Sequence, residues 1–201
     1  MATIVNRNHY PDQSIYTLNI HGANITITVT ASTSILENWI STTLLLPRDY
    51  YPYAKFIIGF AIDHEVNTLQ FSLYHSCLIS QIAQAGSVPQ ILRDFMKDYH
   101  VGFPGMNNLW YRRTLMSKYA MELKMDPADL ALWYAGGKHG HFSLNEIVLN
   151  MFGINVNQRE EIRMSDWSGH NLSDEQIIFA CIDTHYGYMI GREFKAWQWG
   201  L

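Results

Sequence analysis

The chain has 201 residues, of which 48% are hydrophobic and 16% are charged, and its formal net charge is −4 at pH 7. This length and composition suit one domain with a sizeable apolar core. The acidic balance excludes a strong non-specific polyanion binder, because such binding depends on Lys and Arg displacing counterions from phosphate. The sequence shows no basic-then-apolar leader and no apolar run near the roughly 20 residues of a spanning helix, so membrane insertion is not expected.

The N-terminal part of the chain predicts a β-hairpin followed by a helix. Apolar and polar residues alternate over 16–20 and again over 25–29, and the link 21–24 has the composition of a turn. Ser34 then begins a capping-box pattern, and apolar residues follow it at helical spacing. We therefore expect a helix from there to about Leu45.

The middle of the chain predicts a small meander and then a crossover. Residues 56–63, 68–73 and 77–79 read as three short strands, and the short links between them favour antiparallel pairing. Pro89 is suited to open a helix, and the apolar residues 101–103 read as a short buried strand after it. Three antiparallel strands followed by a parallel strand with helices around it predict an α/β fold with α+β order.

The C-terminal half predicts four more helices. They are expected over 109–118, from the cap Asp126-Pro127 to Gly136-Gly137, from the cap Ser143 to Gly153, and from Asp174 onward. The last of these follows a capping box made by Ser173 and Gln176.

The run 164–185 carries the most specific pattern in the chain. It contains Ser165-x-Trp167, then Leu-Ser-x-Glu-Gln at 172–176, then Phe179-x-x-x-Asp183. Phe179 and Asp183 are four residues apart, so both project from one helical face. The run resembles the third motif of the DEDDy family of 3′–5′ exonucleases, in particular small plant proteins similar to the exonuclease domain of the Werner-syndrome helicase. That family has a tyrosine where Phe179 stands.

The resemblance covers most of the chain from the first hairpin onward. Further matching segments are Thr68-Leu69-Gln70-Phe71, Val88-Pro89-x-x-Leu92-Arg93-x-Phe95 and Val101-Gly102-Phe103. The resemblance implies a ribonuclease-H-like, DnaQ-like fold, whose mixed sheet has three antiparallel strands plus parallel strands flanked by helices. We expect a single exonuclease-like domain over residues 1–201, with the N-terminal hairpin and helix at about 14–46 and the core at about 54–196.

In this family an Asp-x-Glu on the first core strand and two further aspartates hold two divalent cations, usually magnesium. Such cations need oxygen ligands, and a metal pair stabilises both the attacking and the leaving oxygen of phosphodiester cleavage. Two alignments of the first motif are open. Without a gap, Ala61 stands at the aspartate and Asp63 at the glutamate; with a two-residue insertion, Asp63 and Glu65 form the intact pair. The ungapped alignment keeps the strand register, so we favour it.

The other two motifs also depart from the family. Asn108 stands where the second motif has aspartate, and an amide offers oxygen but no negative charge. Asp183 is retained, whereas Phe179 lacks the hydroxyl that positions the attacking water in the family. The resemblance implies a catalytic set of Asp63, Glu65, Asn108, Phe179 and Asp183, in which Asp63, Glu65 and Asp183 hold Mg²⁺ or Mn²⁺ weakly. We expect activity to be weak or lost.

A basic cluster on the expected 109–118 helix is the local candidate for nucleic-acid contact. Trp110 lies beside Arg112 and Arg113 in the sequence, and aromatic side chains interleaved with cations form platforms that stack single-stranded bases. A solvated helix face, or packing of Trp110, fits the same residues equally well.

Two functions of different classes follow from these observations. One is a metal-dependent 3′–5′ exonuclease acting on single-stranded RNA or DNA, and the other is an inactive relative that binds nucleic acid or a partner protein. Some small plant relatives form hexameric rings, so the resemblance implies self-association. Cys77 and Cys181 lie in apolar segments and fit buried reduced thiols, which favours an intracellular protein, cytoplasmic or nuclear.

Overall fold

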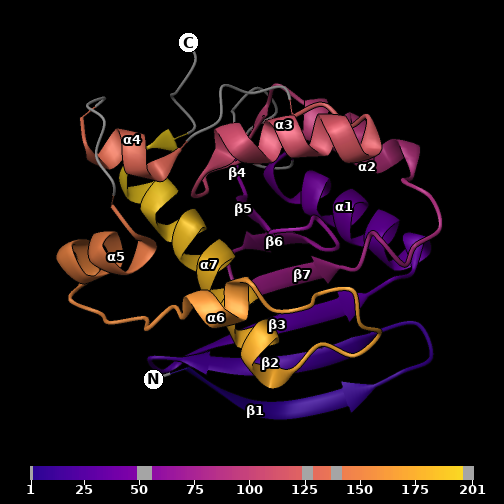
Figure 1. The fold of residues 1–201 in the computed structure, drawn as a ribbon, viewed down its shortest axis with the longest axis horizontal. Coiled ribbons are helices and arrows are strands. Elements are labelled where there is room, and N and C mark those ends of the chain that lie inside the picture. Colours follow the sequence, from indigo (N-terminus) through magenta and orange to yellow (C-terminus); the bar gives the residue numbers. More distant parts are fainter. Residues whose placement is uncertain (1, 49–55, 124–128, 137–141, 197–201) are drawn as a thin grey trace.

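The centre of the molecule is a six-stranded mixed sheet. The computed structural model describes residues 2–48, 56–123, 129–136 and 142–196. The sheet order is β1-β2-β3-β7-β6-β5 (Figure 1), and neighbouring strands run antiparallel except β3 and β7, which pair in parallel. Its strands are β1 (Ala2–His9), β2 (Ser14–Ile20), β3 (Ala23–Thr30), β5 (Gly59–Ile62), β6 (Leu69–Leu73) and β7 (Ser76–Ser80).

The N-terminal hairpin is confirmed, and it has one strand more than expected. β2 and β3 pair in register across His21 and Gly22, both of which have positive φ, as a type I′ turn requires. β1 adds to the outer edge of β2 but was not predicted. Only Ala2 and Ile4 of β1 pack partly against the core, so its sequence lacks the alternation that marks a half-buried strand.

The expectation of one strand over residues 56–63 is wrong. The segment forms two strands, β4 (Phe56–Ile57) and β5, and β4 pairs in parallel with β8 (Val101–Gly102) in a separate two-stranded sheet. β5 ends at Ile62, so Asp63 lies in the turn that follows it. The chain passes from the two-stranded sheet to the six-stranded sheet at Ile58, whose N–H donates to Gly102 O at 2.9 Å.

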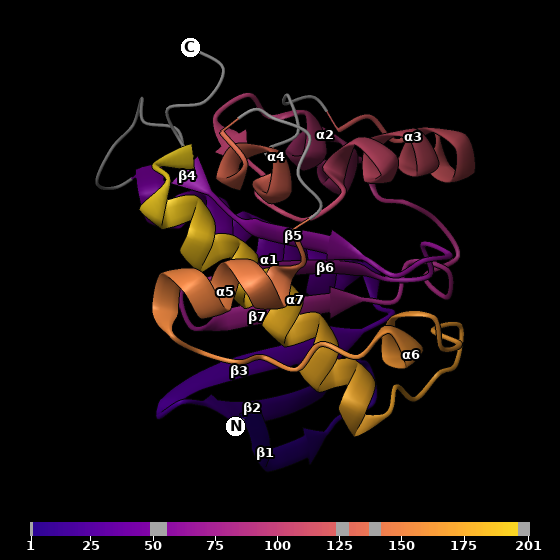
Figure 2. The same cartoon turned by 60° about the vertical axis from the view of Figure 1, so that its left-hand side comes forward.

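The long helix α7 (Asp174–Glu193) crosses one face of the sheet, while α1 lies on the opposite face (Figures 1 and 2). Close approach of α7 to β5 requires glycine at position 59. A Cβ on Gly59 would lie 1.9 Å from Thr184 O and 2.8 Å from Tyr188 N, both of which belong to the α7 backbone. The first core strand therefore lies directly under the middle of α7.

Six other helices surround the sheet. Both predicted capping boxes, at Ser143 and at Ser173, are confirmed, and each serine accepts from the backbone N–H three residues on. The cap expected at 126–127 lies outside the described residues; within them, Asp129 caps the helix that follows. The short helix α6 was not predicted. The helices are α1 (Thr33–Arg48), α2 (Gln90–Lys97), α3 (Asn108–Tyr119), α4 (Leu130–Tyr134), α5 (Leu144–Phe152) and α6 (Glu160–Arg163).

The apolar core fills the spaces on both sides of the sheet. Aromatic rings meet edge to face in the layer between the sheet and α2, where Phe71 and Phe103 both pack against Phe95. Cys77 on β7 and Cys181 on α7 are both buried with free thiols, as predicted. Within the described ranges, none of the helices has the length and apolar character needed to cross a membrane.

Candidate functional site

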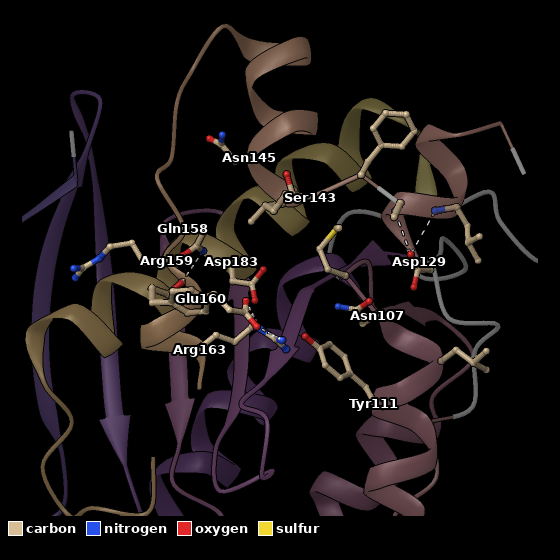
Figure 3. Close-up of a pocket in the computed structure, with 17 residues that line it drawn as sticks. Asn107, Tyr111, Asp129, Ser143, Asn145, Gln158, Arg159, Glu160, Arg163 and Asp183 are labelled. Atoms are coloured by element: carbon tan, nitrogen blue, oxygen red, sulfur yellow. Dashed lines mark hydrogen bonds and ion pairs between the residues drawn. The ribbon is translucent and has the colours of Figure 1, made fainter. Parts of the chain in front are cut away.

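A cavity of about 1030 Å³ opens beside the middle of α7 (Figure 3). The N-terminal ends of α3, α4 and α5 and the segment around α6 form its other walls. The lining combines apolar and aromatic side chains with many polar ones. The polar lining residues are Asn107, Tyr111, Asp129, Ser143, Asn145, Gln158, Arg159, Glu160, Arg163 and Asp183.

Asp183 lies at the centre of this cavity (Figure 3). Asp183 is half-buried on the cavity wall, and desolvation raises its pKa from the ordinary 3.8 to about 7; the nearby guanidinium of Arg163 opposes the shift. Near neutral pH the carboxyl therefore holds its proton for much of the time. This is an unusual state for an acid that is expected to bind a cation.

Tyr111 and Arg163 lie next to Asp183. Tyr111 comes from α3, is buried, and has its hydroxyl near Ile62 at the end of β5. Burial raises the pKa of Tyr111, the charge of Asp183 raises it further, and Arg163 lowers it. In Figure 3 the Tyr111 hydroxyl points toward the guanidinium of Arg163, close to Asp183. The three side chains form one polar cluster on the cavity wall.

Arg163 is also held by an acid of its own helix. Its Nε donates to Glu160 Oε2 at 2.9 Å, and its Nη2 donates to Glu160 Oε1, so the pair is bidentate. This contact lowers the pKa of Glu160 and raises that of Arg163. The side chain of Arg163 is 41% exposed and that of Glu160 is 68% exposed. Exposed pairs of this kind contribute little to stability.

Asp63, the acid common to both alignments of the first motif, lies in the turn after β5 and is 2% exposed. Its Oδ2 accepts from Asn67 N at 2.8 Å and from Thr68 N at 2.6 Å and Thr68 Oγ1 at 3.0 Å, and its Oδ1 accepts from Glu65 N at 3.0 Å. Both carboxylate oxygens are therefore used by the turn that Asp63 itself begins.

The end of α3 holds the same turn from outside. Lys118 Nζ donates to Glu65 O and to Val66 O, and Tyr119 Oη donates to Val66 O at 2.9 Å. Val66 has a positive φ of 57°, which a β-branched residue adopts only when its surroundings enforce it. The Glu65 side chain is 58% exposed and accepts from Asn67 Nδ2 at 3.2 Å. Glu65 thus lies on the outside of the turn.

The remaining motif positions are divided between core and cavity. Ala61 is buried on β5 opposite Gln70, and Asn108 is buried at the start of α3, where its Nδ2 donates to Phe103 O at 2.7 Å. Neither lines the cavity. Phe179 does line it and packs against Trp167, with ring centroids 6.3 Å apart.

These donors do not fit a two-metal centre. Ala61 has no ligand atom, the Asp63 oxygens are engaged in the turn, and Asn108 offers only a neutral amide oxygen. Across the described ranges, no group of three or more His, Cys, Asp or Glu residues is arranged to hold a metal ion. Asp183 faces the cavity with Arg163, not a second motif carboxylate, beside it. The positive charge of the Arg163 guanidinium therefore acts on Asp183.

The sequence pattern gave no indication of several residues that make the cavity. Asn107 takes a left-handed conformation, with φ at 59°, and its side chain lines the cavity where Asn108 does not. Tyr111 lies three residues after Asn108 on α3, a spacing that could have placed both on one side of the helix. Arg163 and Glu160 belong to α6, for which the sequence has no clear helical period.

The basic cluster expected on α3 lies outside the cavity lining. Trp110 is 42% exposed, Arg112 is half-buried and Arg113 is exposed, so all three are on or near the surface. Lys118 on the same helix is bonded to the Asp63 turn. The surface of α3 is therefore a separate candidate for nucleic-acid contact.

No protein-family model and no curated protein matches the sequence. Solved structures do match the fold. Escherichia coli RNase D, an exoribonuclease involved in structured RNA processing, matches with a TM-score of 0.67 and 12% identity over 84% of this chain and 44% of that one. The catalytic core of RRP6 from Trypanosoma brucei matches with a TM-score of 0.66 and 14% identity over 84% of this chain and 46% of that one.

Brucella melitensis NrnC also matches, with a TM-score of 0.59 and 15% identity over 72% of this chain and 74% of that one. The chain spans less than half the length of the RNase D and RRP6 structures. The chain has the ribonuclease-H-like fold of these structures, as its sequence motifs predicted.

Proposed function

We propose that this protein binds single-stranded nucleic acid in the cavity beside α7 and does not hydrolyse it. The carrying observation is the state of Asp63, whose two carboxylate oxygens accept hydrogen bonds within its own turn. A carboxylate used in this way can hold a catalytic cation only in competition with the turn. The fold is that of exonuclease domains, while Asn108 and Phe179 stand where that family has aspartate and tyrosine.

The lining of the cavity supports a nucleic-acid ligand. Its carboxamides, at Asn107, Asn145 and Gln158, can pair with base edges, and the aromatic ring of Phe142 offers a face for stacking. Arg159 and Arg163 supply cations at a local site, which an acidic chain needs for phosphate contact. The volume of about 1030 Å³ is at the upper end of ordinary ligand sites.

The catalytic alternative rests on Asp183, which retains its place on α7 and faces the cavity. In that alternative Asp63, Glu65 and Asp183 bind Mg²⁺ or Mn²⁺ after the Asp63 turn has opened. The test is 3′-end shortening of labelled single-stranded RNA and DNA with either cation, alongside Asp183→Ala. We expect no shortening above background. Shortening that Asp183→Ala abolishes would establish the enzyme and overturn the non-hydrolytic proposal.

Binding is tested separately, by fluorescence anisotropy of short labelled RNA and DNA strands. Arg159→Glu reverses a charge in the cavity lining, and Arg113→Glu makes the same change on the exposed face of α3. We expect the first to weaken binding about tenfold and the second to have little effect, because local phosphate contacts dominate affinity. If Arg113→Glu weakened binding and Arg159→Glu did not, the binding site would instead lie at Trp110, Arg112 and Arg113 on α3.

A protein-interaction role is the second candidate, and one surface favours it. Leu109, Trp110 and Met116 on α3 and Leu132 on α4 are all at least 40% exposed. Exposed apolar groups on adjacent helices can mark an interface, including one between copies of the chain, as in the hexamers of some relatives. Light scattering after size-exclusion chromatography tests self-association directly. The two free buried thiols support a reducing compartment inside the cell.

A further inference from the structure

The Arg163–Glu160 pair at the cavity has the geometry of an anion site that is closed by a carboxylate of the chain itself. Glu160 engages the guanidinium with both carboxylate oxygens, through Nε and Nη2. This two-point contact is the one that a phosphate makes with arginine. Because the pair is exposed and sits on a four-residue helix, exchanging Glu160 for another anion costs little.

Further donors converge on the same place from other elements. The Tyr111 hydroxyl can donate its proton, and it points toward Arg163 (Figure 3). Arg163 has five N–H donors, of which Glu160 takes two. Once Glu160 has moved away, Arg163 and Tyr111 together offer several hydrogen-bond donors. A phosphodiester has only two free oxygens to accept from them.

The burial of the cluster determines whether the end or the interior of a nucleic-acid strand can reach it. Tyr111 is 5% exposed, so a phosphate that reaches its hydroxyl lies against a closed wall. A diester carries a nucleoside on each side, and both would have to fit beside that wall. A terminal phosphate carries only one nucleoside and has three free oxygens.

We propose that the cavity recognises the terminal phosphate monoester of a single-stranded nucleic acid, through Arg163 and Tyr111, and that Glu160 occupies this site when no strand is bound. The inference rests on the proposed binding function, of which it names the ligand. It requires no metal ion, because the guanidinium neutralises the phosphate.

The test compares strands of one sequence that end in a 3′-phosphate, a 5′-phosphate or hydroxyl groups only, with fluorescence anisotropy in the presence of EDTA. We expect a phosphate-ended strand to bind about tenfold more tightly than the hydroxyl-ended strand, and the two phosphate arms to show which end is read. Arg163→Gln is expected to remove this preference. Glu160→Gln, which removes the competing charge, is expected to raise affinity for the phosphate end about two- to fivefold.

Arg7→Gln is the matched control, because Arg7 forms an exposed ion pair with Asp174 away from the cavity; it should leave the preference unchanged. If Arg163→Gln does not fold, the wild-type preference and the Glu160→Gln gain still decide the outcome. Equal binding of all three strands, still weakened by Arg159→Glu, would overturn the phosphate inference and leave the binding function standing. Failure of every strand to bind would overturn both.

Discussion

At the scale of single residues, a carboxylate at position 63 can either accept hydrogen bonds within its turn or bind a metal ion. The Asp63 carboxylate accepts hydrogen bonds within its turn. Four hydrogen bonds converge on its carboxylate from residues 65–68, three of them from backbone N–H groups. Hydrogen bonds to a charged acceptor are stronger than neutral ones, and buried donors that lose their acceptor pay a desolvation cost. Asp63 is therefore needed for folding whether or not the protein has a ligand.

We expect Asp63→Ala to lower the free energy of unfolding by about 3 kcal/mol, because it leaves buried N–H groups without an acceptor. Urea denaturation at neutral pH measures the change. Glu65→Ala is the control, since that side chain is mainly exposed and should change stability by less than about 0.5 kcal/mol. A fully stable Asp63→Ala protein would show that the turn does not depend on this carboxylate.

Asp183 gives a prediction with a definite pH dependence. Its folded pKa of about 7 lies above the unfolded value, so the charged form is disfavoured in the native protein. Stability from this group is complete below about pH 4, is lost as the pH rises toward 7, and does not return above it. The difference in pKa corresponds to about 4 kcal/mol at most, and less where the cavity admits water.

Asp183→Asn places a neutral amide of the same shape at this position. We expect the variant to be more stable than the wild type at about pH 8 and to lose this advantage at about pH 4, where the wild-type carboxyl is neutral as well. Urea titrations at the two pH values provide the comparison. An advantage of equal size at both values would contradict the protonated state of Asp183.

At the scale of elements, the approach of α7 to β5 sets the position of Asp183 over the sheet. Gly59 makes this approach possible, since any Cβ there would overlap the α7 backbone. The clash is with backbone atoms on a packed helix, so no side-chain movement can relieve it. The glycine before the first motif is thus explained by packing alone, without a catalytic role.

Gly59→Ala is expected to destabilise the protein by more than about 3 kcal/mol, because α7 must shift away from the sheet. Gly169→Ala is the matched control: its added Cβ would come no closer than 3.6 Å to Asn171 O, an ordinary contact. Thermal unfolding followed by circular dichroism compares the two. Similar melting temperatures for both variants would mean that α7 is not held as closely as described.

At the scale of the whole molecule, local patterns predicted the elements well and long-range ones poorly. The capping boxes at Ser143 and Ser173 depend on residues three apart, so the sequence contains the whole motif. The edge strand β1 and helix α6 have no strong apolar period in the sequence. Tertiary contacts hold them in place instead. Asp63 could not be placed from spacing, since its partners depend on where β5 ends. Arg163 reaches Asp183 only through the path of the chain around α7.

The absence of a fitting ligand set has a consequence for the molecule as a whole. A protein that binds cations in its native state is stabilised by them through mass action. We expect millimolar Mg²⁺ or Mn²⁺ to leave the melting temperature unchanged within about 1 °C, and EDTA to have no effect. A clear rise that Asp183→Ala removes would indicate a metal site formed by rearrangement of the Asp63 turn.

The parallel pairing of β3 with β7 also bears on how the chain reaches its folded state. β1 to β3 are joined by short turns, and so are β5 to β7, so each set can assemble from local contacts. The seam between them joins residues 26–30 to 76–80, which lie far apart in the sequence, so a long loop must close before it forms. Formation of the seam should therefore limit the folding rate, and the interval before it closes leaves two sheet edges open to intermolecular pairing.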